Sequence, residues 1–201
     1  MTNINDKQIH KAVDILWKGG IVVYPTETVY GIGCNPSNRE ACERIQLYKK
    51  RSDFKPMLLL ASSLSQVEDF IGKLTDVAQR LSEIFWPGPL TMVLKPVKKL
   101  PDHLLGLSGG VAVRVTSHTV AVSLTSKFGF PMTSTSANLT GESPILTYED
   151  AVKTFGKCAD IILKNTEILH GKPSTVIDLT TKHLALIREG SITLSRIKEE
   201  L

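Results

Sequence analysis

The sequence is poor in cysteine and in long apolar runs. Its three cysteines, Cys34, Cys42 and Cys158, form no C-x-x-C pair, which argues against a disulfide framework and a structural zinc site and favours a reducing compartment. No uninterrupted apolar run is long enough to span a bilayer, and residues 1–7 lack the basic start and apolar core of a signal peptide. We therefore expect a cytoplasmic protein without membrane segments.

Several common catalytic and cofactor motifs are also missing. There is no G-x-x-x-x-G-K-[ST] loop, so any use of ATP is not of the Walker type, and Gly31-Ile32-Gly33 lacks the third glycine of a dinucleotide fingerprint. The five histidines are scattered without paired spacing, so we predict no protein metal ligands. No cysteine has an obvious basic partner in sequence that would make it a nucleophile.

The excess of positive over negative charge is small. The chain has 24 Lys+Arg against 20 Asp+Glu, a net charge of +4 and a pI of about 8.9. That balance suits a nucleotide or RNA, and it is equally common in soluble enzymes. An aromatic content of 6% and the lack of an RRM signature count against sequence-specific reading of RNA.

The chain of 201 residues, 42% of them hydrophobic, fits one domain over residues 1–201. Helical spacing of apolar residues from Ile9 to Trp17 precedes a stop at Gly19-Gly20 and a strand over 21–24. Ser37 and Glu40 have capping-box spacing and predict a second helix, followed by a buried strand over 57–61.

The alternation of helix and strand continues to the end of the chain. We expect a helix around 77–85, strands at 91–94 and 111–115, a helix over 120–128, and short elements near 161, 176 and 186. Such interleaving predicts an α/β (α+β) fold, with helices packed on a mixed sheet.

Two polar tracts follow predicted elements directly. Residues 25–33 crowd hydroxyls after a buried strand, where an α/β sheet usually presents its ligand crevice, although an ordinary strand-end turn has the same composition. Lys49, Lys50, Arg51 and Lys55 gather at a helix end, where cations complement the helix dipole. The alternative is a phosphate clamp, because transfer from a triphosphate requires several positive groups.

Three further tracts carry a polar residue at the end of, or inside, an apolar strand. Arg114 interrupts the strand 111–115 and either faces solvent or meets a carboxylate in a pocket. Residues 134–138 pack hydroxyls and an amide where a strand ends, and residues 173–178 together with Arg188 repeat the pairing of a hydroxyl and a cation.

These tracts together resemble the threonylcarbamoyl-AMP synthase family of the YrdC type, from Gly19-Gly20 to Ile192. The resemblance rests on YPTETVYGIG at 24–33, the K-x-R of Lys49 and Arg51 with Lys55-Pro56, WPGPLT at 86–91, VAVRV at 111–115, STSAN at 134–138 and STVID at 174–178, in the order typical of the family. It implies a twisted mixed sheet with helices around a large, positively charged cavity, in a short form without the extra C-terminal domain of long members.

The resemblance also implies an activity and a set of site residues. The reaction would form threonylcarbamoyl-AMP and pyrophosphate from L-threonine, bicarbonate or CO2, and ATP with Mg²⁺, for the N6-threonylcarbamoyl modification of adenosine 37 in tRNA. The product would pass to the tRNA threonylcarbamoyl transferase machinery, and contact with tRNA would be indirect or weak. The implied threonine site is Thr28, Arg114, Ser134 and Ser174; the implied ATP site is Arg51, Lys55, Ser136, Asn138 and Arg188; Lys49 and Arg51 are the implied catalytic cations.

Two departures and two alternatives accompany this interpretation. Some members carry a histidine shortly after the K-P pair, where this chain has Leu58-Leu59-Leu60, and the family pattern leaves Ser143 without a clear place. The alternatives are a non-catalytic module that binds tRNA or double-stranded RNA, and a paralogue with an altered substrate. No side-chain nucleophile is required for the synthase reaction, since positioning and charge neutralisation can carry it.

Overall fold

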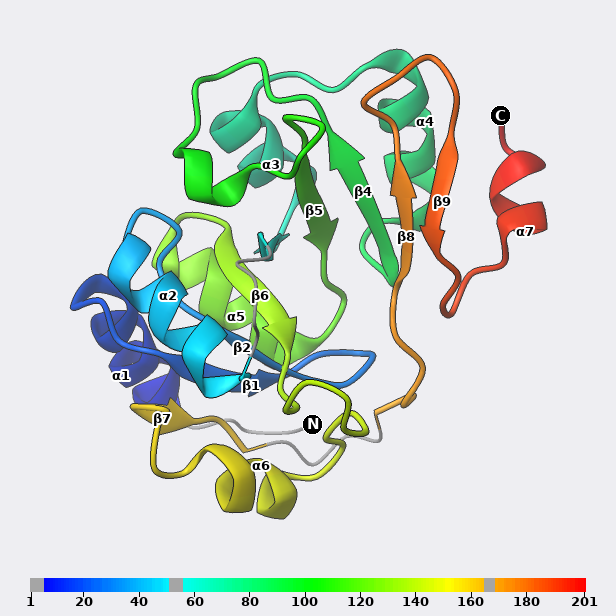
Figure 1. Cartoon of the computed structure of the whole chain (residues 1–201). Helices are drawn as coiled ribbons and strands as arrows, with labels where there is room; N and C mark the ends of the chain where they lie inside the picture. Colours follow the sequence, from blue (N-terminus) through cyan, green and yellow to red (C-terminus); the bar gives the residue numbers. More distant parts are fainter. Residues whose placement is uncertain (1–5, 51–55, 165–168) are drawn as a thin grey trace.

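A computed structural model describes residues 6–50, 56–164 and 169–201, which form a mixed α/β fold (Figure 1). In chain order the helices and strands are α1 (Asp6–Trp17), β1 (Val22–Pro25), β2 (Tyr30–Gly33), α2 (Arg39–Tyr48), β3 (Leu58–Ala61), α3 (Leu64–Ile71), α4 (Asp76–Phe85), β4 (Leu90–Leu94), a 3-10 turn (Asp102–Leu104), β5 (Val111–Val115), α5 (Thr119–Phe128), β6 (Met132–Ser136), α6 (Tyr148–Phe155), β7 (Ile161–Ile162), β8 (Thr175–Asp178), β9 (Ala185–Arg188) and α7 (Leu194–Lys198). The predicted fold class is therefore confirmed.

Within the described ranges the strands form one twisted sheet of nine, in the order β7-β1-β2-β6-β3-β5-β4-β8-β9. The sheet contains three parallel pairs (β1 with β7, β3 with β5, β4 with β8) among the described strands, and its other pairs are antiparallel, so it is mixed as predicted. Strand β6 pairs with β2 on one side and β3 on the other, and it joins the two halves of the sheet visible in Figure 1.

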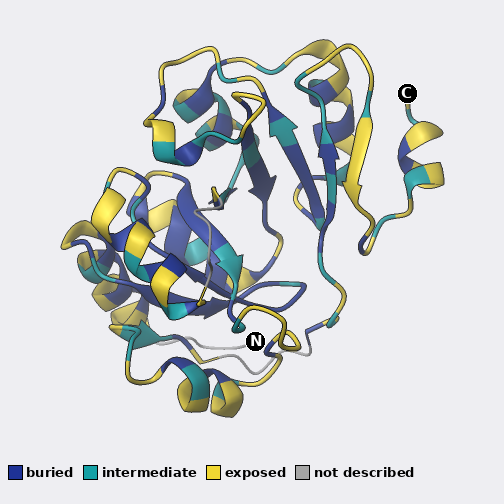
Figure 2. Ribbon diagram, in the orientation of Figure 1, coloured by how far each residue is buried: buried dark blue, intermediate teal, exposed yellow. Residues whose placement is uncertain are grey.

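Helices cover the sheet in three groups, and the strands alternate between them. In β1, Val22 and Tyr24 pack against α1 and α5, whereas Val23 packs against the side of α2 and α6. Both faces of the strand are thus buried, which explains its unbroken apolar run. Figure 2 shows the central strands buried and β9, at the sheet edge, exposed. In the described ranges no helix combines the length and apolar character needed to cross a membrane.

The third apolar group supports the other half of the sheet. Helices α3 and α4 pack on Leu59, Met92, Val113 and their neighbours in β3, β4 and β5. Each fully buried leucine of this kind stabilises the fold by about 2 kcal/mol. The three cysteines are free, and Cys34 and Cys42 are buried.

Two local predictions are wrong. The cap of α2 is Asn38 rather than Ser37: the Asn38 carboxamide oxygen accepts from the Ala41 N–H at 2.9 Å, while the Ser37 N–H donates to Asn35. An asparagine caps as well as a serine and stands one residue closer to the helix.

The tract after β1 is also more than a turn, because Tyr30–Gly33 forms strand β2 of a hairpin. Gly33 allows β2 to approach β6, since a Cβ there would lie 1.8 Å from the Thr133 carbonyl oxygen. Gly33 therefore serves the packing of β2 against β6.

Candidate active site

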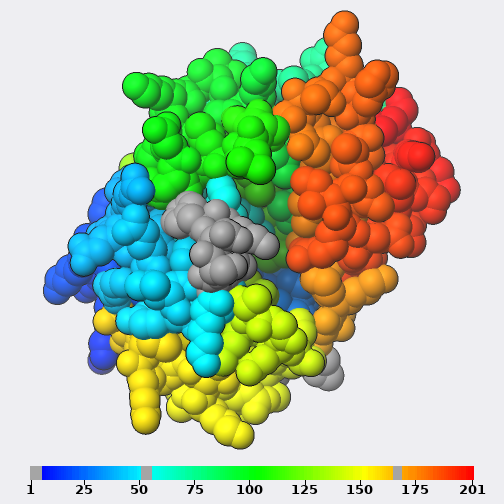
Figure 3. Space-filling model, viewed as in Figure 1, coloured from blue at the N-terminus to red at the C-terminus, as the bar shows by residue number. Residues whose placement is uncertain are grey.

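A cavity of about 770 Å³ opens on one face of the sheet, between the β1–β2 turn, β6 and the β8–β9 edge. In the space-filling view, the orange residues of β8 and β9 face the yellow-green segment that follows β6 across a hollow (Figure 3). The cavity gathers most of the predicted site residues. Those that line it are Thr28, Arg114, Ser134, Ser136, Asn138, Ser174 and Arg188.

The alternation of strand residues explains how separate tracts reach this cavity. In β5, Val111, Val113 and Val115 enter the apolar core, so Ala112 and Arg114 point to the opposite face. The same alternation turns Thr91 of β4 and Val176 of β8 into the cavity. The sheet register places these residues on adjacent strands, with Thr91 beside Val176.

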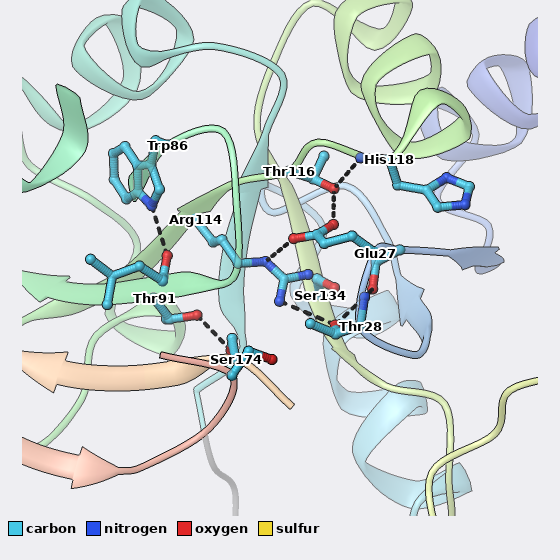
Figure 4. A network of polar contacts seen from close by, with 12 residues as sticks. Glu27, Thr28, Trp86, Thr91, Arg114, Thr116, His118, Ser134 and Ser174 are labelled. Carbon is cyan, nitrogen blue, oxygen red and sulfur yellow. Dashed lines mark hydrogen bonds and ion pairs between the residues drawn. The ribbon is translucent and has the colours of Figure 1, made fainter. Parts of the chain in front are cut away.

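Arg114 faces the cavity rather than bulk solvent. Its side chain is 5% exposed and its Nη1 lies 3.4 Å from the Thr28 hydroxyl oxygen. Its Nε lies 3.8 Å from Glu27 Oε1, close enough for an ion pair and too far for a hydrogen bond. Figure 4 shows the guanidinium between these two residues of the β1–β2 turn. A buried guanidinium of this kind suits a carboxylate ligand.

The β1–β2 turn uses one threonine for local structure and presents another. The Thr26 hydroxyl donates to the Val29 carbonyl at 2.6 Å and lies 2.9 Å from the Thr28 hydroxyl. Thr26 thus bonds nearby backbone as in an ordinary turn, and Thr28 is held at the cavity wall beside Arg114.

Ser134 is oriented by a buried tyrosine. The Tyr24 hydroxyl donates to Ser134 Oγ at 2.6 Å, and burial raises the pKa of the Tyr24 phenol, which keeps it a neutral donor. A serine that accepts from a tyrosine keeps its own proton for another acceptor. Ser134 can therefore donate to a ligand in the cavity.

Ser174 and Arg188 form a second polar group across the cavity. Ser174 Oγ lies 2.9 Å from the Thr91 hydroxyl, and Arg188 donates through Nη2 to the Ser174 carbonyl at 2.9 Å and to its Oγ at 3.2 Å. Partial desolvation of the guanidinium, and secondly the positive charge of Arg114, lower the pKa of Arg188, although the residue as a whole is exposed at the sheet edge. Two guanidiniums therefore face one space, and an anion between them would relieve their repulsion.

Lys49, predicted as a catalytic cation, is held in a buried position beside the chain that follows β6. It is 2% exposed and does not belong to the cavity lining. Its ammonium donates to the Ser136 carbonyl and, at 2.6 Å, to the Asn138 carbonyl. Because burying an ammonium requires such partners, Lys49 fixes the chain after β6, where Ser136 and Asn138 meet the cavity.

Some predictions of site residues fall elsewhere. Arg51 and Lys55 lie outside the described residues. Of the apolar stretch after the K-P pair, Leu58 lines the cavity, whereas Leu59 and Leu60 enter the core. Ser143 is exposed and does not line the cavity, although the next residue, Pro144, does.

Three polar residues of the site were not singled out from the sequence. Glu27 and Thr116 hold the surroundings of Arg114, and Thr91 contacts Ser174. Thr91 closes the WPGPLT tract, so its place in an ordered motif was a usable signal. Thr116 offers none, because a threonine just after a strand is ordinary in any sheet protein.

The mixed sheet, and a cavity that combines two arginines with hydroxyls from four strand ends or turns, define an α/β protein with a pocket suited to a small carboxylate or phosphate ligand. The chain belongs to the Sua5/YciO/YrdC family: the family model, described as "Telomere recombination", matches residues 14–190.

Relatives and solved structures agree with this membership. A Vibrio campbellii protein named threonylcarbamoyl-AMP synthase is 33% identical over 186 residues, 92% of this chain and 100% of that protein. The crystal structure of P. abyssi Sua5 complexed with L-threonine superposes with a TM-score of 0.92 at 32% identity over 100% of this chain, which spans 59% of the Sua5 chain. E. coli YciO gives a TM-score of 0.87 at 33% identity, covering 96% of this chain and 94% of YciO.

Proposed function

We propose that the protein is an L-threonylcarbamoyladenylate synthase, which forms threonylcarbamoyl-AMP and pyrophosphate from L-threonine, bicarbonate or CO2, and ATP. The observation that carries the proposal is the convergence of Thr28, Arg114, Ser134 and Ser174 on one cavity. The relatives named threonylcarbamoyl-AMP synthase and the Sua5 complex with L-threonine support it. Use of the product for N6-threonylcarbamoyladenosine in tRNA is part of the same proposal.

Arg114 and the hydroxyls beside it form the threonine end of the cavity. The guanidinium binds the threonine carboxylate, and the hydroxyls of Thr28 and Ser134 offer hydrogen-bonding partners to its other polar groups. Because Arg114 is 4% exposed, little water competes for this contact. Leu58, Ala112 and Val176 supply an apolar lining beside these groups.

Arg188 marks the junction between the two substrates. It donates to Ser174, so a phosphate bound by Arg188 lies within reach of a ligand bound by Ser174. The threonine amine adds to CO2, the carbamate oxygen attacks the α-phosphorus of ATP, and pyrophosphate leaves. Arg188 neutralises the charge that develops at the α-phosphate, while Ser136 and Asn138 hold ATP nearby. Mg²⁺ would enter with ATP as the Mg·ATP substrate, where it would supply neutralisation of the phosphate charge.

The test is pyrophosphate release with purified protein, Mg·ATP, L-threonine and bicarbonate. We expect release that depends on both threonine and bicarbonate, and an adenylate product whose mass contains both. Arg114→Ala, purified in parallel, controls for a contaminating enzyme. If pyrophosphate release does not depend on threonine, the proposal is wrong. Salt-sensitive tRNA binding without turnover would then favour an RNA-binding module, and release driven by a different amine would favour a paralogue.

A further inference from the structure

Glu27 is a buried carboxylate beside the cavity and outside its lining. Its side chain is 10% exposed, and its Oε1 faces the Nε of Arg114 at 3.8 Å. Among the residues that the structure describes, neither of these two buried atoms has a hydrogen-bond partner. Such atoms are costly to leave unpaired, at about 1–3 kcal/mol each, so their alignment across a short gap requires an explanation.

The second carboxylate oxygen of Glu27 is firmly held. The Thr116 hydroxyl donates to Glu27 Oε2 at 2.6 Å, and its oxygen accepts from the backbone N–H of His118 at 3.3 Å. Because a hydroxyl has one proton, acceptance from His118 directs that proton to Glu27. Figure 4 shows this relay from the start of α5, through Thr116 and Glu27, to Arg114.

The backbone of the relay is fixed from two directions. Thr116 continues the pairing of β5 with β3, since its N–H donates to the Ala61 carbonyl at 3.1 Å. The Glu27 carbonyl accepts from the His170 N–H at 3.3 Å, and the Thr28 carbonyl accepts from the Gly171 N–H at 2.9 Å. The carboxylate is therefore anchored on rigid elements.

Different N–H groups of the Arg114 guanidinium therefore face different partners. Its Nε edge faces Glu27 and its Nη1 faces Thr28, which leaves the remaining terminal N–H groups for the cavity. Without Glu27, the Arg114 side chain would lose the group that fixes its rotation and would be drawn toward any anion in the cavity, the ATP phosphates included.

We propose that Glu27, held by Thr116, is a positioning residue that fixes the Arg114 guanidinium for an α-amino-acid carboxylate and keeps it from the nucleotide phosphates. The part that names the ligand rests on the proposed function, since it takes the L-threonine carboxylate as the partner of Arg114. The part that concerns the orientation of Arg114 stands without any substrate.

The first experiment measures the separate KM values of threonine and ATP in four variants. Glu27→Gln keeps the shape and removes the charge, and we expect its threonine KM to rise about tenfold while the ATP KM stays within twofold. Thr116→Val should raise the threonine KM about threefold, and Thr116→Ser, which keeps the hydroxyl, should restore it. The threonine KM should rise further in Glu27→Ala than in Glu27→Gln. Equal shifts in both KM values, or unchanged values, would overturn the inference.

The second experiment observes Arg114 directly and needs no turnover. In ¹⁵N spectra, the Arg114 Nε–H signal, assigned by its loss in Arg114→Lys, should be sharp in the wild type and in Thr116→Ser. It should broaden or shift in Thr116→Val and Glu27→Gln. If the Arg114 Nε–H signal is unaltered in both Thr116→Val and Glu27→Gln, the positioning role is refuted even if the enzyme is active. Altered signals in a protein that neither binds threonine nor releases pyrophosphate would refute the proposed function alone.

Discussion

Two cavities of nearly equal volume lie on this molecule, and they differ in how their cations are held. The candidate active site measures about 770 Å³, and a second cavity of about 740 Å³ lies between the α3–α4 connection, the end of β4 and the β8–β9 turn. In the first, Arg114 is buried and held by Thr28 and Glu27. In the second, three lysines, Lys73, Lys95 and Lys182, are exposed around an apolar floor.

Cavity volume alone therefore does not identify the candidate active site. An exposed lysine keeps its rotamer freedom and its charge is screened by water and salt. A buried guanidinium with fixed neighbours gives a ligand both an undamped charge and a geometry that is already in place.

Loss of Arg114 should have the largest effect. Arg114→Ala leaves the threonine carboxylate without its counter-ion in a buried site, a loss of about 3 kcal/mol, so kcat/KM for threonine should fall roughly 100-fold. Steady-state pyrophosphate release measures it. Arg114→Lys keeps the positive charge and loses the two-pronged guanidinium. Its kcat/KM for threonine should lie between those of the wild type and Arg114→Ala. Activity within threefold of wild type in Arg114→Ala would remove this residue from the site.

Loss of Lys49 should act on stability instead. Lys49→Met leaves the Ser136 and Asn138 carbonyls without their ammonium donor, which should lower the free energy of unfolding by about 2–4 kcal/mol. Urea denaturation checks this. The matched control is Lys50→Met, at the exposed neighbouring residue, with a change below about 0.5 kcal/mol. A Lys49→Met protein as stable as the control, yet inactive, would return Lys49 to the catalytic cations.

Ser174 should have a smaller, substrate-specific effect. Ser174→Ala removes a neutral hydrogen-bonding group worth about 1 kcal/mol, so we expect the threonine KM to rise about fivefold. Ser143→Ala is the control, because Ser143 is exposed and does not line the cavity. An equal rise in both variants would contradict the assignment of Ser174 and place Ser143 in the site.

The fold was predictable where burial and periodicity agree. Strand 111–115 was predicted with its observed bounds, and α1 and α5 to within a few residues, because apolar spacing reports directly which face is buried. Strand β2 was missed because its glycines carry no strand signal, although Gly33 is needed for close packing against Thr133. Asn38 was missed as a cap because Ser37 and Glu40 matched a stronger pattern.

The site was predictable in its residues and less so in their functions. The ordered motifs singled out Thr28, Arg114 and Ser174, which the fold then gathers. The sequence places Lys49 near a helix end without saying which way its side chain points, and here the side chain turns inward to the chain after β6. The relay through Glu27 and Thr116 joins residues 89 apart in sequence, and only the sheet register brings them together.

The smallest effect should come from the second cavity, and it completes the contrast. The triple variant Lys73→Ala, Lys95→Ala and Lys182→Ala removes its exposed cations while leaving its apolar floor intact. Since exposed charges are screened over about 10 Å at 0.1 M salt, the KM values for threonine and ATP should stay within twofold of wild type. Steady-state kinetics at low and at physiological salt measure both. A fall in kcat/KM of threefold or more at both salt concentrations would show that the lysines act on the reaction by contact rather than by a screened field. The contrast between a cavity with a buried, hydrogen-bonded cation and a cavity with exposed lysines would then not indicate where this fold binds its substrates.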